Sequence, residues 1–346
     1  MPRFELAWLL GALLALLLVI DSPEARACSV CLAGDSIYTA NGASAGQAGQ
    51  ASIYVELLGY KKKSGELPEP ESSAPEGEGG GGEEEGGAPP SFEKAPPQPT
   101  ERALNRRLNV FGSWTPIDRL TLSVNVPIAF NDIVSDDGDT STHTQLTGLG
   151  DVSITASGVL WRNRDVLPST WLEGRLFLKA PTGPSKQRVD GDVDPHLQTG
   201  TGSWDTGFGF AVGHRLEWGS LYGSVFGRIN TEGSLQYQYG NSFLANAALE
   251  VPLGHALGVE SLQRFSLGGE LNFRYSTHDE FHGESYSDSG GSVLYVTPSL
   301  RIRLPWFGER APMLRAAVQV PVTSHWLYGK QTEYPVWSVG IGYSFR

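Results

Sequence analysis

The sequence predicts an all-β protein, an antiparallel transmembrane β-barrel of about twelve strands in an outer membrane. The first observation behind this prediction is alternation: Leu172, Leu176 and Leu178 share one face of an expected strand, and charged residues occupy the other. The second is length, because most expected strands have ten to fifteen residues, against about five or six in soluble proteins. The third is that short turns alternate with longer polar loops, as in bacterial outer-membrane barrels.

Composition narrows the class of protein. The chain has 346 residues, a formal net charge of -12 and a mean hydropathy of -0.21. These values exclude a helical membrane protein but fit a barrel, in which roughly every second residue of a strand is apolar. After residue 27 no stretch approaches the roughly 20 consecutive apolar residues of a spanning helix. Without a basic surplus, nucleic acid is not an expected partner.

Residues 1–27 are predicted to be a cleaved secretory signal peptide. Arg3 lies in a short first region, residues 7–20 are apolar, and Ala25-Arg26-Ala27 forms an A-x-A cleavage signal. The mature chain would then begin at Cys28. A lipid anchor on this cysteine is less favoured, because the position two before it is Arg26 rather than a small residue.

Residues 28–50 are expected to form an N-terminal periplasmic segment or a plug in the barrel mouth. Cys28 and Cys31 are candidates for a local disulfide in an oxidising compartment. Haem attachment would need a histidine after the second cysteine, where Leu32 stands. A redox role stays open, because the C-x-x-C spacing lowers a thiol pKa.

Residues 51–346 are predicted to be the barrel, with a first strand at 52–60. Within it, residues 61–101 are rich in Gly, Glu and Pro and are expected to form a disordered, solvated loop, because they offer too little apolar surface to offset the entropy of ordering. Regular alternation then predicts strands 104–114 and 119–130 with a tight turn between them, and a long polar loop at 131–146.

Nine further strands complete the prediction, and an even total of twelve places both termini on the periplasmic side. Aromatic residues fall near the expected strand ends, where the interfacial girdles of barrels lie: Trp114, Trp161, Trp204, Trp218, Trp306, Trp326, Trp337 and Tyr343. The nine strands are expected at 147–161, 170–180, 201–216, 220–231, 241–251, 264–277, 291–304, 311–322 and 335–345.

Several short motifs carry a resemblance to a known family. They are G-L-G-D at 148–151, K-A-P-T-G at 179–183, G-T-G-S-W-D at 200–205, and Q-V-P-V at 319–322, followed by G-K-Q at 329–331 and the closing strand. Over most of residues 101–346 the chain resembles the MetA-pathway of phenol degradation family of transporter-like outer-membrane proteins. The resemblance implies a pore-like barrel that takes up aromatic or other hydrophobic compounds.

Charged residues on the inward face are the candidates for lining a pore. They could form a water-filled constriction that orients solutes, or pair across the lumen and brace it. Arg301 and Arg303 would share one face and favour anionic or carboxylated solutes. The predicted pore-lining residues are Asp151, Glu173, Arg175, Lys179, Asp205, Glu270, Arg274, Arg301, Arg303 and Arg315.

The predicted function is a porin-like pore or transporter for the passive movement of small, hydrophobic or aromatic solutes across a Gram-negative-type outer membrane. The alternative is a non-conducting surface or structural barrel. An outer-membrane enzyme is less favoured, because almost all of the seven histidines fall in expected loops or turns. Expected partners are outer-membrane lipid and lipopolysaccharide, the barrel-assembly machinery and the solute.

No cofactor, metal or catalytic residue is expected. His278 and His282 are spaced like the two histidines of a zinc motif, but Glu280 stands at the wrong offset and the segment is not helical. The aspartates at 190, 192 and 194 lack the Gly and terminal Glu that a calcium loop needs.

Overall fold

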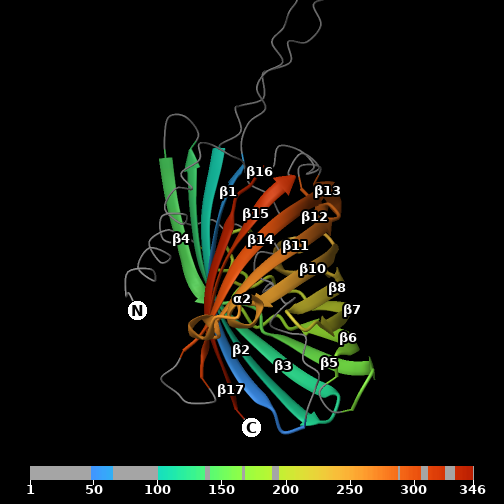
Figure 1. Cartoon of the computed structure of the whole chain (residues 1–346). Coiled ribbons are helices and arrows are strands. Elements are labelled where there is room, and N and C mark those ends of the chain that lie inside the picture. The colour runs from blue at the N-terminus through green and yellow to red at the C-terminus, as the bar shows by residue number, and fades with distance from the viewer. Residues whose placement is uncertain are drawn as a thin grey trace, which may run out of the picture.

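The computed structural model in Figure 1 describes eight segments of the chain. They comprise residues 48–64, 100–136, 141–165, 168–188, 195–286, 289–304, 311–323 and 332–345. The predicted signal peptide, Cys28 and Cys31, and residues 65–99 of the predicted loop lie outside these segments, so those predictions are untested. The predicted bounds of the loop are wrong at both ends, because residues 61–64 belong to one strand and residues 100–101 to the next.

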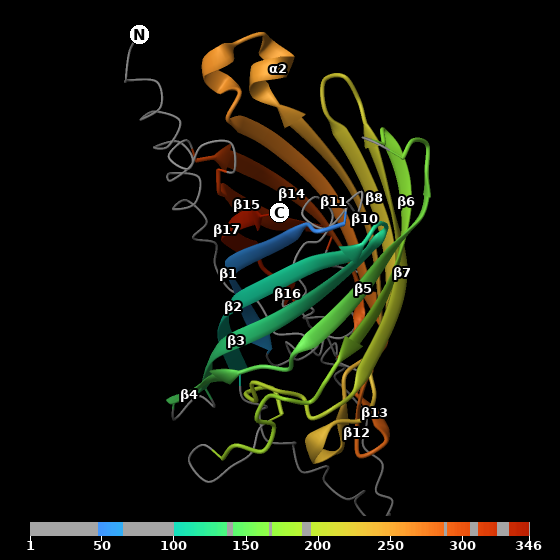
Figure 2. The same ribbon diagram turned by 90° about the horizontal axis from the view of Figure 1, so that it is seen from below.

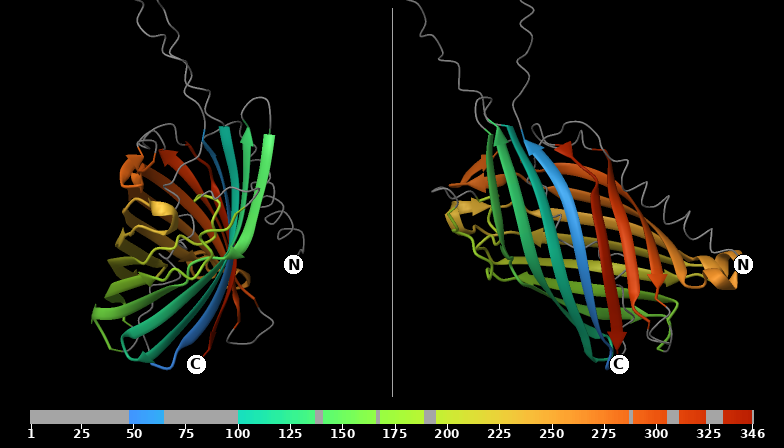
Figure 3. Two further views of the ribbon diagram at one scale, coloured as in Figure 1. Left: turned by 180° about the vertical axis from the view of Figure 1, so that it is seen from behind. Right: turned by 90° about the vertical axis from the view of Figure 1, so that its left-hand side faces the viewer.

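Twelve long strands close into an antiparallel barrel (Figure 3), which confirms the predicted fold. Each strand pairs with the next one around the ring, and the last strand pairs back with β1. In ring order they are β1 (Ala51–Ser64), β2 (Thr100–Ile117), β3 (Leu120–Asp136), β5 (Ser153–Arg162), β6 (Thr170–Lys179), β7 (Asp205–Arg215), β8 (Ser220–Ile229), β10 (Ser242–Pro252), β11 (Phe265–Ser276), β14 (Gly291–Arg303), β15 (Met313–Thr323) and β17 (Val336–Phe345).

Smaller helices and strands lie at both ends of the barrel. Helix α2 (Leu253–Leu257) and the short turn η2 (Glu260–Leu262) occupy the connection between β10 and β11. At the opposite end (Figure 2), β9 (Tyr237–Gln238), β12 (Asp279–Phe281) and β13 (Glu284–Tyr286) form a three-stranded sheet. The remaining elements are β4 (Ser141–Leu149), η1 (Ser234–Gln236) and β16 (Thr332–Glu333). In the part of the chain that is described, no helix is long and apolar enough to cross a membrane.

The apolar side chains of the strands lie on the outer face of the barrel. On β6, Leu176 is 66% exposed, whereas Glu173 on the alternate face is 1% exposed. This is the reverse of a soluble protein and matches a strand with one face toward lipid. The outer belt runs right round the ring, and its exposed members include Ile53, Leu122, Ile154, Phe208, Leu271 and Ile341.

Tryptophans mark the strand ends as expected. Trp114, Trp161, Trp204 and Trp218 are all exposed. Trp337 instead lies flat over Gly59 of the neighbouring strand, since a Cβ on that glycine would come within 2.4 Å of the indole ring. Trp306 and Trp326 lie outside the described residues.

The predicted loop at 131–146 is wrong. β3 continues to Asp136 and β4 starts at Ser141, so these residues form a hairpin that extends beyond the apolar belt. On its outer face Asp132 is hydrogen-bonded to His143 and Gln145. The missing apolar alternation suggested a loop, yet strand pairing and β-branched threonines suffice to hold an extended hairpin outside lipid.

The single strand predicted at 147–161 is also wrong, because two strands cover these residues. β4 ends at Leu149 and β5 begins at Ser153. β5 pairs with both β3 and β6, but β4 is paired with β3 alone among the strands described. The hydrogen-bonded wall is therefore interrupted beside β4, above residues 150–152.

Other connections also hold more structure than expected. The predicted loops at 232–240 and 278–290 contribute β9, β12 and β13. In the turn between β5 and β6, Asp165 accepts hydrogen bonds from Arg162 and Arg119, and these bonds together with the two charges lower the pKa of Asp165. Two neighbouring turns are thereby tied together at one rim.

Candidate functional site at the strand break and in the lumen

Three glycines meet where the wall is interrupted. Gly150 follows β4, and Gly183 and Gly200 belong to the loop that joins β6 to β7. A Cβ on Gly183 would lie 2.8 Å from the carbonyl carbon of Gly150 and 2.8 Å from the Cα of Gly200. Only glycine permits this approach of backbones, so we call the contact the three-glycine crossing.

The side chain of Asp151 accepts hydrogen bonds from both arms of the loop at this crossing. Its Oδ1 accepts a hydrogen bond from the backbone N–H of Gly183 at 3.0 Å. Its Oδ2 accepts from the backbone N–H of Thr201 at 2.8 Å and from the Thr201 hydroxyl at 2.7 Å. One buried carboxylate thus holds the loop where it leaves β6 and where it returns to β7.

A chain of charges extends from Asp151 into the lumen. Lys179 Nζ lies 3.3 Å from Asp151 Oδ2 and 2.5 Å from Asp205 Oδ2. Asp205 also accepts from Arg228 at 2.9 Å and from the hydroxyl of Ser203 at 2.9 Å. Three of the predicted pore-lining residues are therefore brought together, and their charges are balanced within one cluster.

The returning arm of the loop lies inside the barrel. Asn131, an inward residue of β3, donates from Nδ2 to the backbone oxygens of Leu197 at 2.9 Å and Gln198 at 3.1 Å. Leu197, Gln198 and Thr199 are all buried. The loop therefore fills part of the lumen at the end that carries β9, β12 and β13.

A second cluster joins strands on the opposite wall. Arg315 on β15 lies 2.9 Å from Glu270 and 3.8 Å from Glu56, and all three side chains are buried. Arg274 donates to Gln319 at 3.1 Å. A buried ion network of this kind braces a wall rather than offering free charge to a solute.

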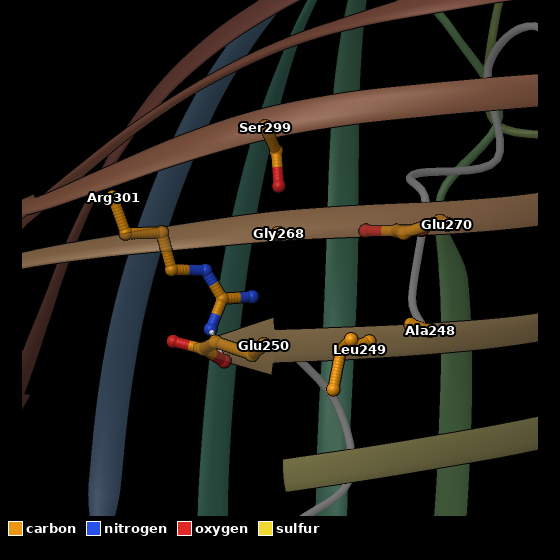
Figure 4. A pocket seen from close by; sticks show the side chains of 7 residues that line it. All are labelled: Ala248, Leu249, Glu250, Gly268, Glu270, Ser299 and Arg301. Atoms are coloured by element: carbon orange, nitrogen blue, oxygen red, sulfur yellow. Dashed lines mark hydrogen bonds and ion pairs between the residues drawn. The ribbon is translucent and has the colours of Figure 1, made fainter. Parts of the chain in front are cut away.

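Figure 4 shows a shallow recess of this wall, lined by residues of β10, β11 and β14. Across it the guanidinium of Arg301 reaches Glu250 at 2.6 Å, passing over Gly268 of the strand between them. A Cβ on Gly268 would lie 2.3 Å from the Ser299 hydroxyl oxygen, so the glycine makes room for that side chain. The positive charge of Arg301 is compensated by Glu250.

The remaining predicted residues occupy separate positions. Glu173 and Arg175 pair with each other on β6 at 2.6 Å. Arg303 is exposed at the end of β14. The role of the whole set in lining a pore stays a prediction, but eight of its ten residues have an opposite charge beside them in the described ion pairs: Asp151, Glu173, Arg175, Lys179, Asp205, Glu270, Arg301 and Arg315.

Sequence reasoning missed the residues that hold the loop. Thr201, Ser203 and Asn131 were not among the predicted site residues, although each contacts the site directly. Asn131 could have been found from the alternation of β3, because it lies an even number of residues from Asn125 and Ala129 and therefore faces inward with them. Ending the strand at residue 130 hid that signal.

Among the described residues, no group of three or more His, Cys, Asp or Glu side chains is arranged to hold a metal ion. Residues 190, 192 and 194 lie outside the described segments. No cofactor is therefore assigned to either charged cluster.

Several solved structures are similar to this chain. The COG4313 outer membrane channel from Pseudomonas putida F1 is similar over 90% of this chain and 98% of that one, with a TM-score of 0.55 and 16% identity. The transport unit of the autotransporter AIDA-I from Escherichia coli has a TM-score of 0.42 at 10% identity, covering 89% of this chain and 92% of that one. A Pseudomonas aeruginosa FadL homologue has a TM-score of 0.39 at 11% identity, covering 85% and 88%.

No family model and no curated protein match the sequence. The resemblance to the phenol-degradation family therefore stays a prediction, although the motifs that carried it at 148–151, 179–183 and 200–205 meet in the three-glycine crossing. The closed twelve-stranded barrel, its apolar outer belt and the likeness to the Pseudomonas putida barrel together identify an outer-membrane β-barrel.

Proposed function

We propose that this protein is a passive outer-membrane channel for small hydrophobic or amphipathic solutes. The observation that carries the proposal is the strand break at residues 150–152. There β4, which pairs with β3 alone among the described strands, gives way to β5, and an inward loop is held by hydrogen bonds to Asp151. A barrel built only as a scaffold needs neither an interrupted wall nor a loop folded into its lumen.

The surroundings of the break favour an apolar solute. Leu149, Ile154 and Leu178 lie beside it with their side chains on the outer face, and all three are exposed. Inside, the charged clusters are internally paired, which disfavours a wide aqueous path for hydrated ions. We further propose that the protein works without a cofactor or a catalytic step, amid outer-membrane lipid and lipopolysaccharide, after insertion by the barrel-assembly machinery.

The test is a reversible lock on the inward loop. A Cβ on Gly148 would lie 3.7 Å from the Cβ of Thr199, within the ~3.5–4.5 Å that separates Cβ atoms in disulfides. In a background with serine at positions 28 and 31, the double variant Gly148→Cys/Thr199→Cys should close this bond on oxidation. We expect the oxidised form to slow the entry of N-phenyl-1-naphthylamine into intact Gram-negative cells to the rate without the protein, and reduction to restore entry.

The two single-cysteine variants serve as controls, because neither forms the bond and both should be insensitive to oxidation. Equal entry rates before and after reduction of the double variant would show that passage does not require the loop to move. Entry no faster than in protein-free cells, even for the reduced and folded protein, would favour the non-conducting surface barrel instead.

A further inference from the structure

The inner face of β2 carries three consecutive inward residues whose polar atoms lack partners. Asn109 is 0% exposed, and neither its Oδ1 nor its Nδ2 has a hydrogen-bond partner. The Oδ1 of Asn105 and the Nε of Arg107 are likewise buried without a partner. These three side chains define what we call the β2 row.

The register of the neighbouring strands places this row on the lumen wall. Asn109 lies between Glu56 of β1 and Pro127 of β3, and Arg107 lies between Leu58 and Ala129. All four of these flanking residues are buried, whereas Arg106, on the alternate face of β2, is exposed. The row therefore faces inward, among polar and apolar neighbours in turn.

Arg107 differs from the lumen cations that take part in described ion pairs, and from Arg274, which has no described ion pair but donates a hydrogen bond to Gln319. Lys179 and Arg228 share Asp205, Arg301 contacts Glu250, and Arg315 contacts Glu270. Across the segments that the structure describes, no ion pair joins Arg107 to a carboxylate. The acid that faces Asn109 on β1 is Glu56, which already contacts Arg315. Arg107 thus keeps an uncompensated positive charge on the wall.

Buried polar atoms without partners are costly, and a charged group costs more than a neutral one. Such an arrangement is stable when a ligand supplies the missing partners. A guanidinium presents its N–H groups in a planar fork that matches the two oxygens of a carboxylate. The amides of Asn105 and Asn109 add hydrogen-bonding groups on either side, and Phe111 and Leu58 offer apolar contact nearby.

From this geometry we propose that the β2 row is a luminal binding site for the carboxylate of a small amphipathic organic acid. The inference rests on the proposed channel function and specifies the solute further. It moves the expected preference for anionic solutes from Arg301 and Arg303 to Arg107, because Arg301 is neutralised by Glu250 and Arg303 lies exposed at a strand end. Apolar surface would hold the solute's hydrocarbon, and Arg107 would hold its charge.

The experiment measures binding of benzoate and of benzyl alcohol to the folded full-length protein by calorimetry. Benzyl alcohol has nearly the same shape without the charge. Arg107→Gln is expected to weaken benzoate binding about tenfold or more and to leave benzyl alcohol unchanged. Arg303→Gln removes the same charge from the exposed end of β14 and should alter neither. Asn109→Ala should weaken benzoate by a smaller factor.

Two results would overturn the inference. One is failure of the unaltered protein to bind benzoate more tightly than benzyl alcohol. The other is equal benzoate affinity in Arg107→Gln, with or without loss of thermal stability, because Arg107 would then serve the wall as a partner of Glu56. The channel proposal is judged separately by the disulfide lock with an uncharged probe. Loss of that response with intact benzoate binding would reject the channel alone.

Discussion

Replacement of Arg315 by methionine is expected to lower the free energy of unfolding by about 3–5 kcal/mol, because it leaves buried acids without their cation. Arg315 is 2% exposed and lies 2.9 Å from Glu270 and 3.8 Å from Glu56. Methionine retains most of the volume, so the loss reflects charge rather than a cavity. Urea unfolding in detergent or lipid vesicles, followed by heat-dependent gel mobility, measures the change.

The matched control is Arg303→Met, which removes an arginine from an exposed position on the neighbouring strand and should change stability by less than about 0.5 kcal/mol. Addition of Glu270→Gln to Arg315→Met should recover part of the loss, since one of the two stranded acids is then neutral. A similar stability for Arg315→Met and Arg303→Met would mean that the network does not brace this wall.

Asp151→Asn is expected to release the inward loop. The carboxylate accepts from Gly183 through one oxygen and from Thr201 through the other. In either orientation an amide turns its NH₂ toward a backbone N–H, so at least one acceptor is lost and two donors face each other. Hydrogen bonds to a charged group contribute about 1.5–3 kcal/mol each, and the loop should therefore open far more often.

Limited proteolysis measures that opening. Lys186 and Arg188 lie on the exposed outgoing arm of the loop, and trypsin should cut there at least about tenfold faster in Asp151→Asn, a factor that corresponds to about 1.4 kcal/mol. Asp132→Asn is the control, since Asp132 contacts His143 and Gln145 on the outer face of the β3–β4 hairpin. Unchanged cleavage in Asp151→Asn would show that other contacts hold the loop.

Much of the fold could be predicted from the sequence, because lipid imposes a strict rule on each strand. Wherever the outer face meets hydrocarbon, apolar residues such as Leu176 and Leu178 must alternate with lumen residues, and this period of two can be recognised in the sequence. Strand residues outside the membrane need not follow this alternation. The β3–β4 hairpin extends past the apolar belt with Asp132 and His143 outside, so its pairing left no apolar pattern to find.

The site was less predictable. Alternation identified Asp151, Lys179 and Asp205 as inward, but their mutual contacts depend on where a loop folds back, and loop paths are not encoded in strand periodicity. The glycines at 150, 183 and 200 stand in three separate motifs, and their shared reason is a close crossing of three backbones. Such a contact between distant segments has no signature in any one of them.

The bracing network also bears on how the barrel is completed. Glu56 belongs to the first strand and Arg315 to the strand before the last, and both are paired in register with Gly340 of β17, which lies between them. Their charges can meet only after β17 has docked against β1, across a residue too small to separate them. In an intermediate that stops before this seam forms, Arg315 can already contact Glu270, whereas Glu56 is separated from this cation. Closure of the ring thus brings a second acid to Arg315, and a barrel that has not closed differs from a finished one in electrostatics as well as in shape.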